Sequence, residues 1–96
     1  MKTETIRYIE ASIEKGYKDA EMHVIKGVIF NYWNVIKSPH CNKTMRDYAD
    51  GLHDAALTMF LYLIWDGEED YHGGVMQFSE LVNSVGKEYG FSKEGK

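Results

Sequence analysis

The middle of the chain constrains the fold most, because one segment combines helical spacing with the most apolar run of the sequence. Across residues 44–66, apolar residues recur three or four positions apart, at Met45, Tyr48, Leu52, Ala56, Met59 and Leu63. That spacing places them on one face of an α-helix. From Ala55 to Trp65 the helix becomes apolar on all sides, which is typical of a helix buried around its circumference. The run spans 11 residues, whereas a membrane-spanning helix needs about 20, so it predicts a core helix.

Two segments before this helix show the same spacing. Residues 4–15 carry an apolar stripe at Ile6, Ile9 and Ile13. Gly16 follows at a position where a left-handed glycine commonly ends a helix. Residues 19–37 carry a broader stripe, made by Met22, Ile25, Ile29, Trp33 and Ile36 and widened by Val24, Val28 and Val35. This second helix is therefore expected to be buried over more than half of its circumference.

The last helical segment covers residues 75–89. Its apolar residues are Val75, Phe78, Val82, Val85 and Tyr89. Gly90 is the expected left-handed residue at its end, and Phe91 can supply the hydrophobic contact that accompanies such an ending.

The connections carry turn signals. Pro39 ends the second helix in one interpretation. In another, Ser38 caps the next helix and Pro39 is its first residue. We favour a later start with Thr44 as the N-cap, because residues 40–43 show little apolar periodicity. Gly73 and Gly74 predict a flexible turn before the last helix.

The four segments, about 4–15, 19–37, 44–66 and 75–89, predict an all-α fold. A chain of 96 residues that is 44% hydrophobic can form one core. We therefore expect a compact, four-helix bundle-like single domain over residues 1–96, with 92–96 as a frayed tail. Three helices can hardly surround a fourth in so small a chain. Part of the apolar run 60–65 is therefore expected to face another copy, which predicts a homo-oligomer, a dimer or higher.

The charge distribution separates the two halves of the chain. Residues 1–46 hold eight bases and five acids, whereas residues 47–96 hold three bases and ten acids. The formal net charge of −4 argues against nucleic-acid binding, which usually requires a basic surface. The charged stretch Met1–Ser12 is not a signal peptide, and the lone Cys41 fits a reducing compartment. We therefore expect a cytoplasmic protein that does not bind a membrane.

A metal site has weak support. Asp47, Asp50 and Asp54 share one helix face, and His53 is adjacent. Such a set could hold a divalent cation, but an ordinary solvated face explains it better. The usual structural zinc site takes several cysteine and histidine ligands at short spacings, and the chain has one cysteine and no His-x-x-x-His pair.

Other chemical motifs also fail. The acids from Asp66 to Asp70 follow the start of a calcium loop, but Tyr71 and Gln77 stand where that loop requires Gly and Glu. No glycine-rich nucleotide motif occurs. We therefore expect a protein that is not an enzyme and holds neither a metal nor a cofactor.

Protein binding is the function that the sequence favours. Acidic and aromatic side chains gather in the second half of the chain, and aromatic residues are enriched at interfaces. We predict that a partner with a basic surface contacts them: Asp47, Asp50, Asp54, Asp66, Glu68, Glu69, Asp70, Tyr71, Tyr62 and Trp65. Small acidic helical proteins without catalytic motifs are common among phage and mobile-element inhibitors of host defence proteins. Size and composition alone suggest that class.

The alternative function is an oligomer that sequesters a small ligand, a nucleotide or a metabolite. Its binding residues would come from the basic half of the chain and converge between subunits. The candidates are Arg7, Arg46, His23 and His40.

Overall fold

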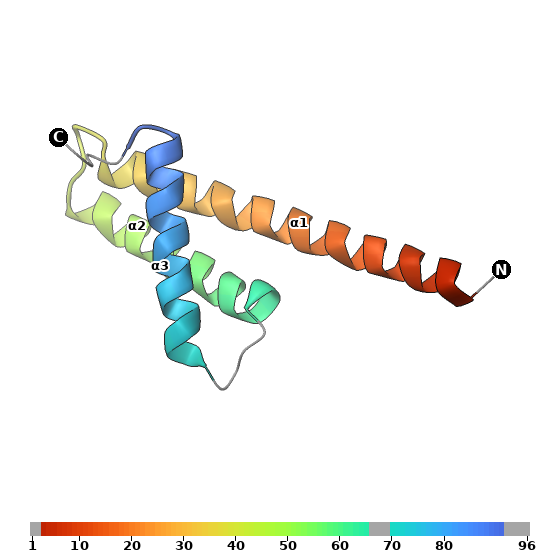
Figure 1. Cartoon of the computed structure of the whole chain (residues 1–96). Coiled ribbons are helices and arrows are strands. Elements are labelled where there is room, and N and C mark those ends of the chain that lie inside the picture. The colour runs from red at the N-terminus through yellow and green to blue at the C-terminus, as the bar shows by residue number, and fades with distance from the viewer. Residues whose placement is uncertain (1–2, 66–69, 92–96) are drawn as a thin grey trace.

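A computed structural model describes residues 3–65 and 70–91 of the chain (Figure 1). These residues form the α-helices α1 (Thr3–Ile36), α2 (Lys43–Met59) and α3 (Tyr71–Glu88), and the short π-helix η1 (Phe60–Ile64). They contain no β-strand. The all-α prediction is confirmed. The four-helix bundle is wrong, because the two helices expected at 4–15 and 19–37 are one continuous helix.

Gly16 does not end the first helix. Among the described glycines, only Gly90 has a positive φ, so Gly16 keeps the right-handed helical conformation. A glycine inside a helix costs about 1 kcal/mol relative to alanine, which weakens a helix without breaking it. No proline follows Gly16 to prevent the next turn, and the helix continues to Ile36.

The three α-helices share one core in the C-terminal half of α1. Figure 1 shows α1 and α2 side by side and antiparallel, with α3 crossing the pair. The short turn between α1 and α2 imposes the antiparallel direction. The core cluster draws on every element, with Ile25, Ile29, Ala56, Phe60, Phe78, Val82 and Val85 as its buried members. Ala49 of α2 is also buried.

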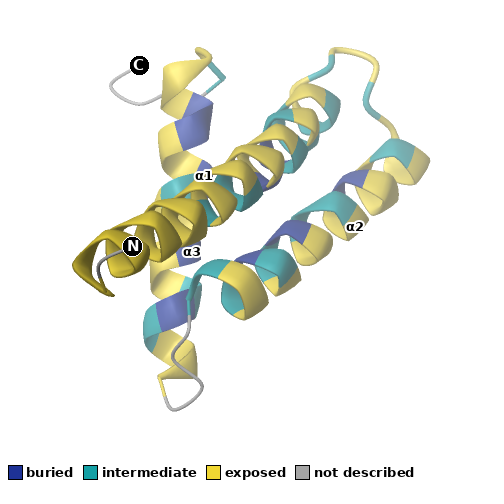
Figure 2. Cartoon of the chain, turned by 90° about the vertical axis from the view of Figure 1, so that its right-hand side faces the viewer, coloured by how far each residue is buried: buried dark blue, intermediate teal, exposed yellow. Residues whose placement is uncertain are grey.

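The N-terminal half of α1 extends away from this core (Figures 1 and 2). Ile6, Ile9 and Ile13 were expected in the core but are exposed. The molecule measures 59 × 28 × 27 Å, with a radius of gyration of 16.7 Å. A compact chain of this length would have a radius of gyration of about 12.5 Å. The compact shape predicted from the sequence is therefore wrong, because the first helix does not fold back.

Side-chain caps define where α2 and α3 begin. Asn42 is the N-cap of α2, and its side-chain oxygen accepts a 2.9 Å hydrogen bond from the backbone N–H of Met45. The later start of this helix is confirmed, but the cap is Asn42 rather than Thr44. Asp70 caps α3 in the same way and accepts from Gly73 N–H at 3.1 Å. The helix therefore begins at Tyr71, and Gly73 and Gly74 lie in its first turn rather than in a preceding loop.

The end of α3 matches the sequence prediction. Gly90 has φ 78°, and its N–H donates to the carbonyl of Lys87 at 3.2 Å. Phe91 N–H donates to the carbonyl of Gly86 at 2.7 Å. These two bonds form a Schellman ending. The Phe91 ring lies 5.6 Å from that of Phe30, so the ending also ties α3 to α1.

The apolar run at the end of α2 is only partly buried. At η1 the helix widens, and Trp65 N–H donates to the carbonyl of Phe60, five residues earlier, at 2.8 Å. Phe60 is buried, whereas Tyr62 and Leu63 are exposed. The expectation of burial around the whole circumference is wrong, since α1 and α3 cover one side of this segment. Residue 66, the expected helix end, lies outside the described residues.

Gly86 allows the close approach of α3 to α1. A Cβ atom at this position would lie 2.8 Å from Cε2 of Trp33, whose Nε1 donates to the carbonyl of Val82 at 2.9 Å.

We expect Gly86→Ala to lower the free energy of unfolding by about 1–3 kcal/mol, because the ring must move and this hydrogen bond is strained. The matched control is Gly51→Ala, which has open space and should stabilise the protein by roughly 0.5–1 kcal/mol. Urea denaturation measures both. A Gly86→Ala variant as stable as the Gly51→Ala variant contradicts the assignment.

The two halves of α1 should differ in local stability. Residues 3–17 are exposed on every side, whereas Ile25 and Ile29 are fully buried. Short helices without tertiary packing are marginal in water. We expect backbone amides of residues 7–17 to exchange hydrogen much faster than those of residues 25–36, as followed by mass spectrometry or NMR. Equal protection of the amides of residues 7–17 and 25–36 would contradict the exposure of the N-terminal half of α1.

Candidate functional site

The acidic face of α2 lies on the side opposite the core. Asp47, Asp50 and Asp54 are exposed, whereas Ala49 and Ala56 on the opposite side are buried. Lys43 Nζ lies 2.9 Å from Asp47 Oδ2, but such an exposed pair contributes little to stability. Asp50 and Asp54 have no lysine or arginine within ion-pair distance in the described part of the chain. These two acids are therefore exposed and outside any ion pair with lysine or arginine in the described residues.

Several predicted binding residues gather where η1 approaches the start of α3. Tyr62 is 82% exposed and Tyr71 is also exposed, while Trp65 is half-buried. Trp65 Nε1 donates a 3.1 Å hydrogen bond to the carbonyl of Asp70. That bond brings Trp65 and Asp70 together across residues 66–69. Asp66, Glu68 and Glu69 belong to the same prediction but lie outside the described residues.

The acidic face and Tyr62 form one continuous side of the molecule. Asp54, Thr58 and Tyr62 follow one another at intervals of four residues, so they lie along one side of α2 and η1. Thr58 Oγ1 donates to the carbonyl of Asp54 at 2.9 Å, which keeps its hydroxyl against the helix. The exposed acids and the exposed aromatic ring are therefore presented in the same direction. We term Asp47, Asp50, Asp54 and Tyr62 the α2 acidic surface.

His53 is a packing residue rather than a member of that surface. Its half-buried ring lies 5.3 Å from the ring of Tyr32 and 5.2 Å from that of Phe78, measured between ring centroids. Nδ1 of His53 is 3.6 Å from Oδ1 of Asp54. The aromatic neighbours account for the position of this imidazole between α1 and α3.

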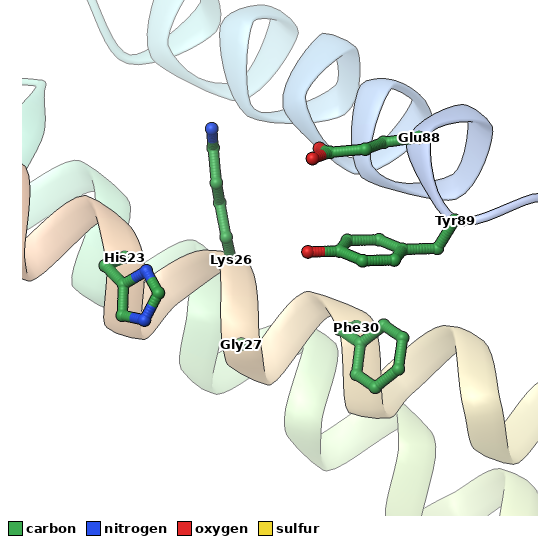
Figure 3. A pocket seen from close by; sticks show the side chains of 6 residues that line it. All are labelled: His23, Lys26, Gly27, Phe30, Glu88 and Tyr89. Atoms are coloured by element: carbon green, nitrogen blue, oxygen red, sulfur yellow. The ribbon is translucent and has the colours of Figure 1, made fainter.

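The alternative ligand residues are not gathered within one chain. His23 borders an open pocket of about 290 Å³ whose other lining residues are Lys26, Gly27, Phe30, Glu88 and Tyr89 (Figure 3). Arg7, Arg46 and His40 do not line it. The helical rise of 1.5 Å per residue places Arg7 about 43 Å from the C-terminal end of α1. His40 lies in the turn that follows that end, and Arg46 lies in the first turn of α2. A site shared between subunits, as the sequence suggested, stays a prediction.

The helix α1 carries a second apolar stripe, which was not predicted from the sequence to be an exposed surface. Six exposed residues make it up: Ile6, Ile9, Ile13, Tyr17, Ala20 and Val24. We term this set the α1 stripe. Its first three members were predicted to form the apolar stripe of a separate helix at 4–15, and Val24 was predicted to widen the stripe of the helix at 19–37. Continuing the spacing of Ile6, Ile9 and Ile13 through Gly16 would have revealed it.

Comparison with known proteins gives no relative: no protein-family model, no curated protein and no solved structure matches this chain. Within the described residues, no helix combines the length and the apolar composition that crossing a membrane requires. The same residues hold no group of three or more His, Cys, Asp or Glu side chains that could share a metal ion. The exposed surfaces are therefore the features from which a function can be inferred.

Burial and the negative charge of Asp50 both act on the phenol of Tyr32. Burial raises the pKa of Tyr32 above its ordinary value of 10.0, and the negative charge of Asp50 raises it further. The folded state therefore favours the neutral phenol. The corresponding stability is fully present below pH 10 and is lost as the pH rises through the raised pKa.

We expect Asp50→Asn to lower the pKa of Tyr32 without returning it to the ordinary value, because burial remains. The pH titration of tyrosinate absorbance is recorded for each protein with and without the additional substitution Tyr32→Phe. The difference between the two titrations isolates the phenol of Tyr32. Asp47→Asn, on the same helix face, is the matched control and should leave the pKa of Tyr32 nearly unchanged. An equal effect of both substitutions would contradict the assignment of Asp50 as the neighbouring charge.

Proposed function

We propose that this protein is a non-enzymatic binding module that acts by contact with a protein partner whose surface is basic. The observation that supports this most directly is the α2 acidic surface, where exposed carboxylates and the exposed ring of Tyr62 lie along one side of α2 and η1. Charged side chains steer a partner of opposite charge and raise its association rate. Exposed aromatic rings supply the contact area that anchors such a complex.

The carboxylates and the ring have complementary roles in this proposal. Asp50 and Asp54 carry negative charge and form no ion pair with lysine or arginine within the described residues, although Arg46 lies one turn before Asp50. Tyr62 offers a large apolar area together with a hydroxyl group that can exchange hydrogen bonds with a partner. The more specific role, inhibition of a host defence protein by a phage or mobile-element protein, has only size and composition in its support.

Self-association is a separate part of the proposal. Tyr62 and Leu63 of η1 are exposed, which supports the expectation that part of the segment 60–65 contacts another copy. The association of identical chains stays a prediction, and the mass of the native complex tests it.

Native mass spectrometry of the protein, purified from the organism that encodes it, tests the proposed function. We expect a complex that contains a second, basic polypeptide. Asp50→Lys combined with Asp54→Lys should abolish that complex, because the charge that attracts the partner is reversed. The melting temperature should stay nearly unchanged, since both side chains are exposed and form no ion pair with lysine or arginine in the described structure.

The matched control is Glu80→Lys combined with Glu88→Lys, which makes the same change in net charge on exposed positions of α3. It should retain the complex. Loss of the complex in both double variants would indicate a general charge effect and contradict the α2 acidic surface. A small molecule of a few hundred daltons in place of a polypeptide would instead favour the ligand-binding alternative.

A further inference from the structure

The helix α1 has two apolar faces, and only one of them is used within the chain. The face that packs on α2 and α3 includes Ile25 and Ile29, which are fully buried. The α1 stripe is the other face. At about 100° per residue, its centre lies about 150° around the helix from the centre of the buried face. A second helix can therefore lie along the α1 stripe without meeting α2 or α3.

The α1 stripe is long and continuous. Its six members follow at spacings of three or four residues from Ile6 to Val24, a length of about 27 Å along the helix. Among its five large side chains, the exposed fraction ranges from 42% at Ile6 to 68% at Tyr17, and Ala20 is also exposed. Single exposed apolar residues are common on protein surfaces, whereas contiguous apolar patches mark sites of interaction. The spacing matches that of helices which pair with another helix.

One edge of the α1 stripe is acidic. Glu10, Glu14 and Glu21 lie along that edge by helical geometry. Within the described residues, these three carboxylates form no ion pair. Of the nearby bases, Lys15 pairs with Asp19 at 3.0 Å, and Lys18 Nζ donates to the carbonyl of Leu63 at 3.0 Å. Arg7, three residues before Glu10, forms no ion pair within the described residues. The edge therefore presents three carboxylates that hold no ion-pair partner within the described residues.

A second copy of the chain does not complement this edge. An antiparallel pair that places Ile13 opposite Tyr17 brings Glu10 of one copy toward Glu21 of the other, so like charges meet. In a parallel pair, the acidic edge faces the opposite edge of the other copy. That edge carries Ser12, Gly16 and His23 and no lysine or arginine. Neither arrangement neutralises the acids, which favours a partner of different sequence.

We propose that the α1 stripe is the docking site for an amphipathic helix of a partner protein, one whose own apolar stripe is bordered by Lys or Arg. This inference rests on the proposed function and assigns it a second contact surface with its own recognition chemistry. The apolar side chains of the partner helix cover Ile9, Ile13 and Tyr17. Its bases pair with the acidic edge, which sets the orientation of the partner helix on α1.

Two designed helical peptides test the proposal by fluorescence anisotropy with the full chain. Both carry the same leucine stripe; one has lysine along the edge and the other has glutamate. We expect the lysine-edged peptide to bind at least about tenfold more tightly. Ile9→Gln combined with Ile13→Gln should reduce its binding by about tenfold or more without lowering the melting temperature, because glutamine is a good helix former and both positions are exposed.

The matched control is Tyr8→Gln, which removes a 74% exposed apolar side chain on another face of the same segment. It should leave peptide binding unchanged. Replacing Glu10, Glu14 and Glu21 together by lysine should reverse the preference between the two peptides. Equal binding of both peptides, or no reversal in the triple variant, overturns the proposal.

Two further outcomes would assign a different occupant and also overturn the proposal. One is a dimer in analytical ultracentrifugation that Ile13→Gln dissociates, which would place a second copy on the α1 stripe. The other is binding to phosphatidylcholine vesicles that the same substitution abolishes, which would place a membrane there. Asp50→Lys with Asp54→Lys should leave peptide binding intact, so failure of the α1 docking site and failure of the α2 acidic surface are distinguished.

Discussion

The contact between Trp33 and Gly86 determines where α3 crosses α1, and the rest of the core depends on that crossing. The ring of Trp33 occupies the space that a side chain at residue 86 would need, and its Nε1 donates to the carbonyl of Val82 on the same helix. With α3 held there, Phe78 reaches the rings of Phe60 and His53. The Schellman ending then carries Phe91 back over Phe30 and Trp33. One close approach thus links all three α-helices.

The same core leaves half of α1 without a neighbour. At 1.5 Å per residue, the 34 residues of α1 extend about 51 Å, whereas the 17 residues of α2 extend about 26 Å. α2 begins beside the C-terminal end of α1 and runs antiparallel to it, so it cannot reach residues 3–17 (Figure 1). α3 crosses α1 rather than running along it. The exposure of the α1 stripe is therefore a direct consequence of helix length and direction.

Local signals in the sequence predicted the helical segments, whereas non-local packing decided how the helices are arranged and which faces are buried. The end of α3 was predictable because Gly90 and Phe91 act within one turn of the helix. Gly16 was not, because a glycine tolerates both a continued helix and a helix end, and no proline directly follows it to stop the helix. Asp70 was assigned to an acidic binding loop, although its position before Tyr71 also suits an N-cap. The stripe of Ile6, Ile9 and Ile13 predicted an apolar helix face, but these residues are exposed in the folded chain, because a pattern does not state whether anything covers such a face.

The two proposed contact surfaces face away from each other. The α2 acidic surface is opposite the side of α2 that packs on α1, and the α1 stripe is roughly opposite the side of α1 that packs on α2. A single short helix therefore cannot touch both. A partner that uses both surfaces must reach around the molecule, or two partners must bind independently. Because Asp50 and Glu10 belong to different helices and share no contact, reversing the charge of one surface should leave the other functional.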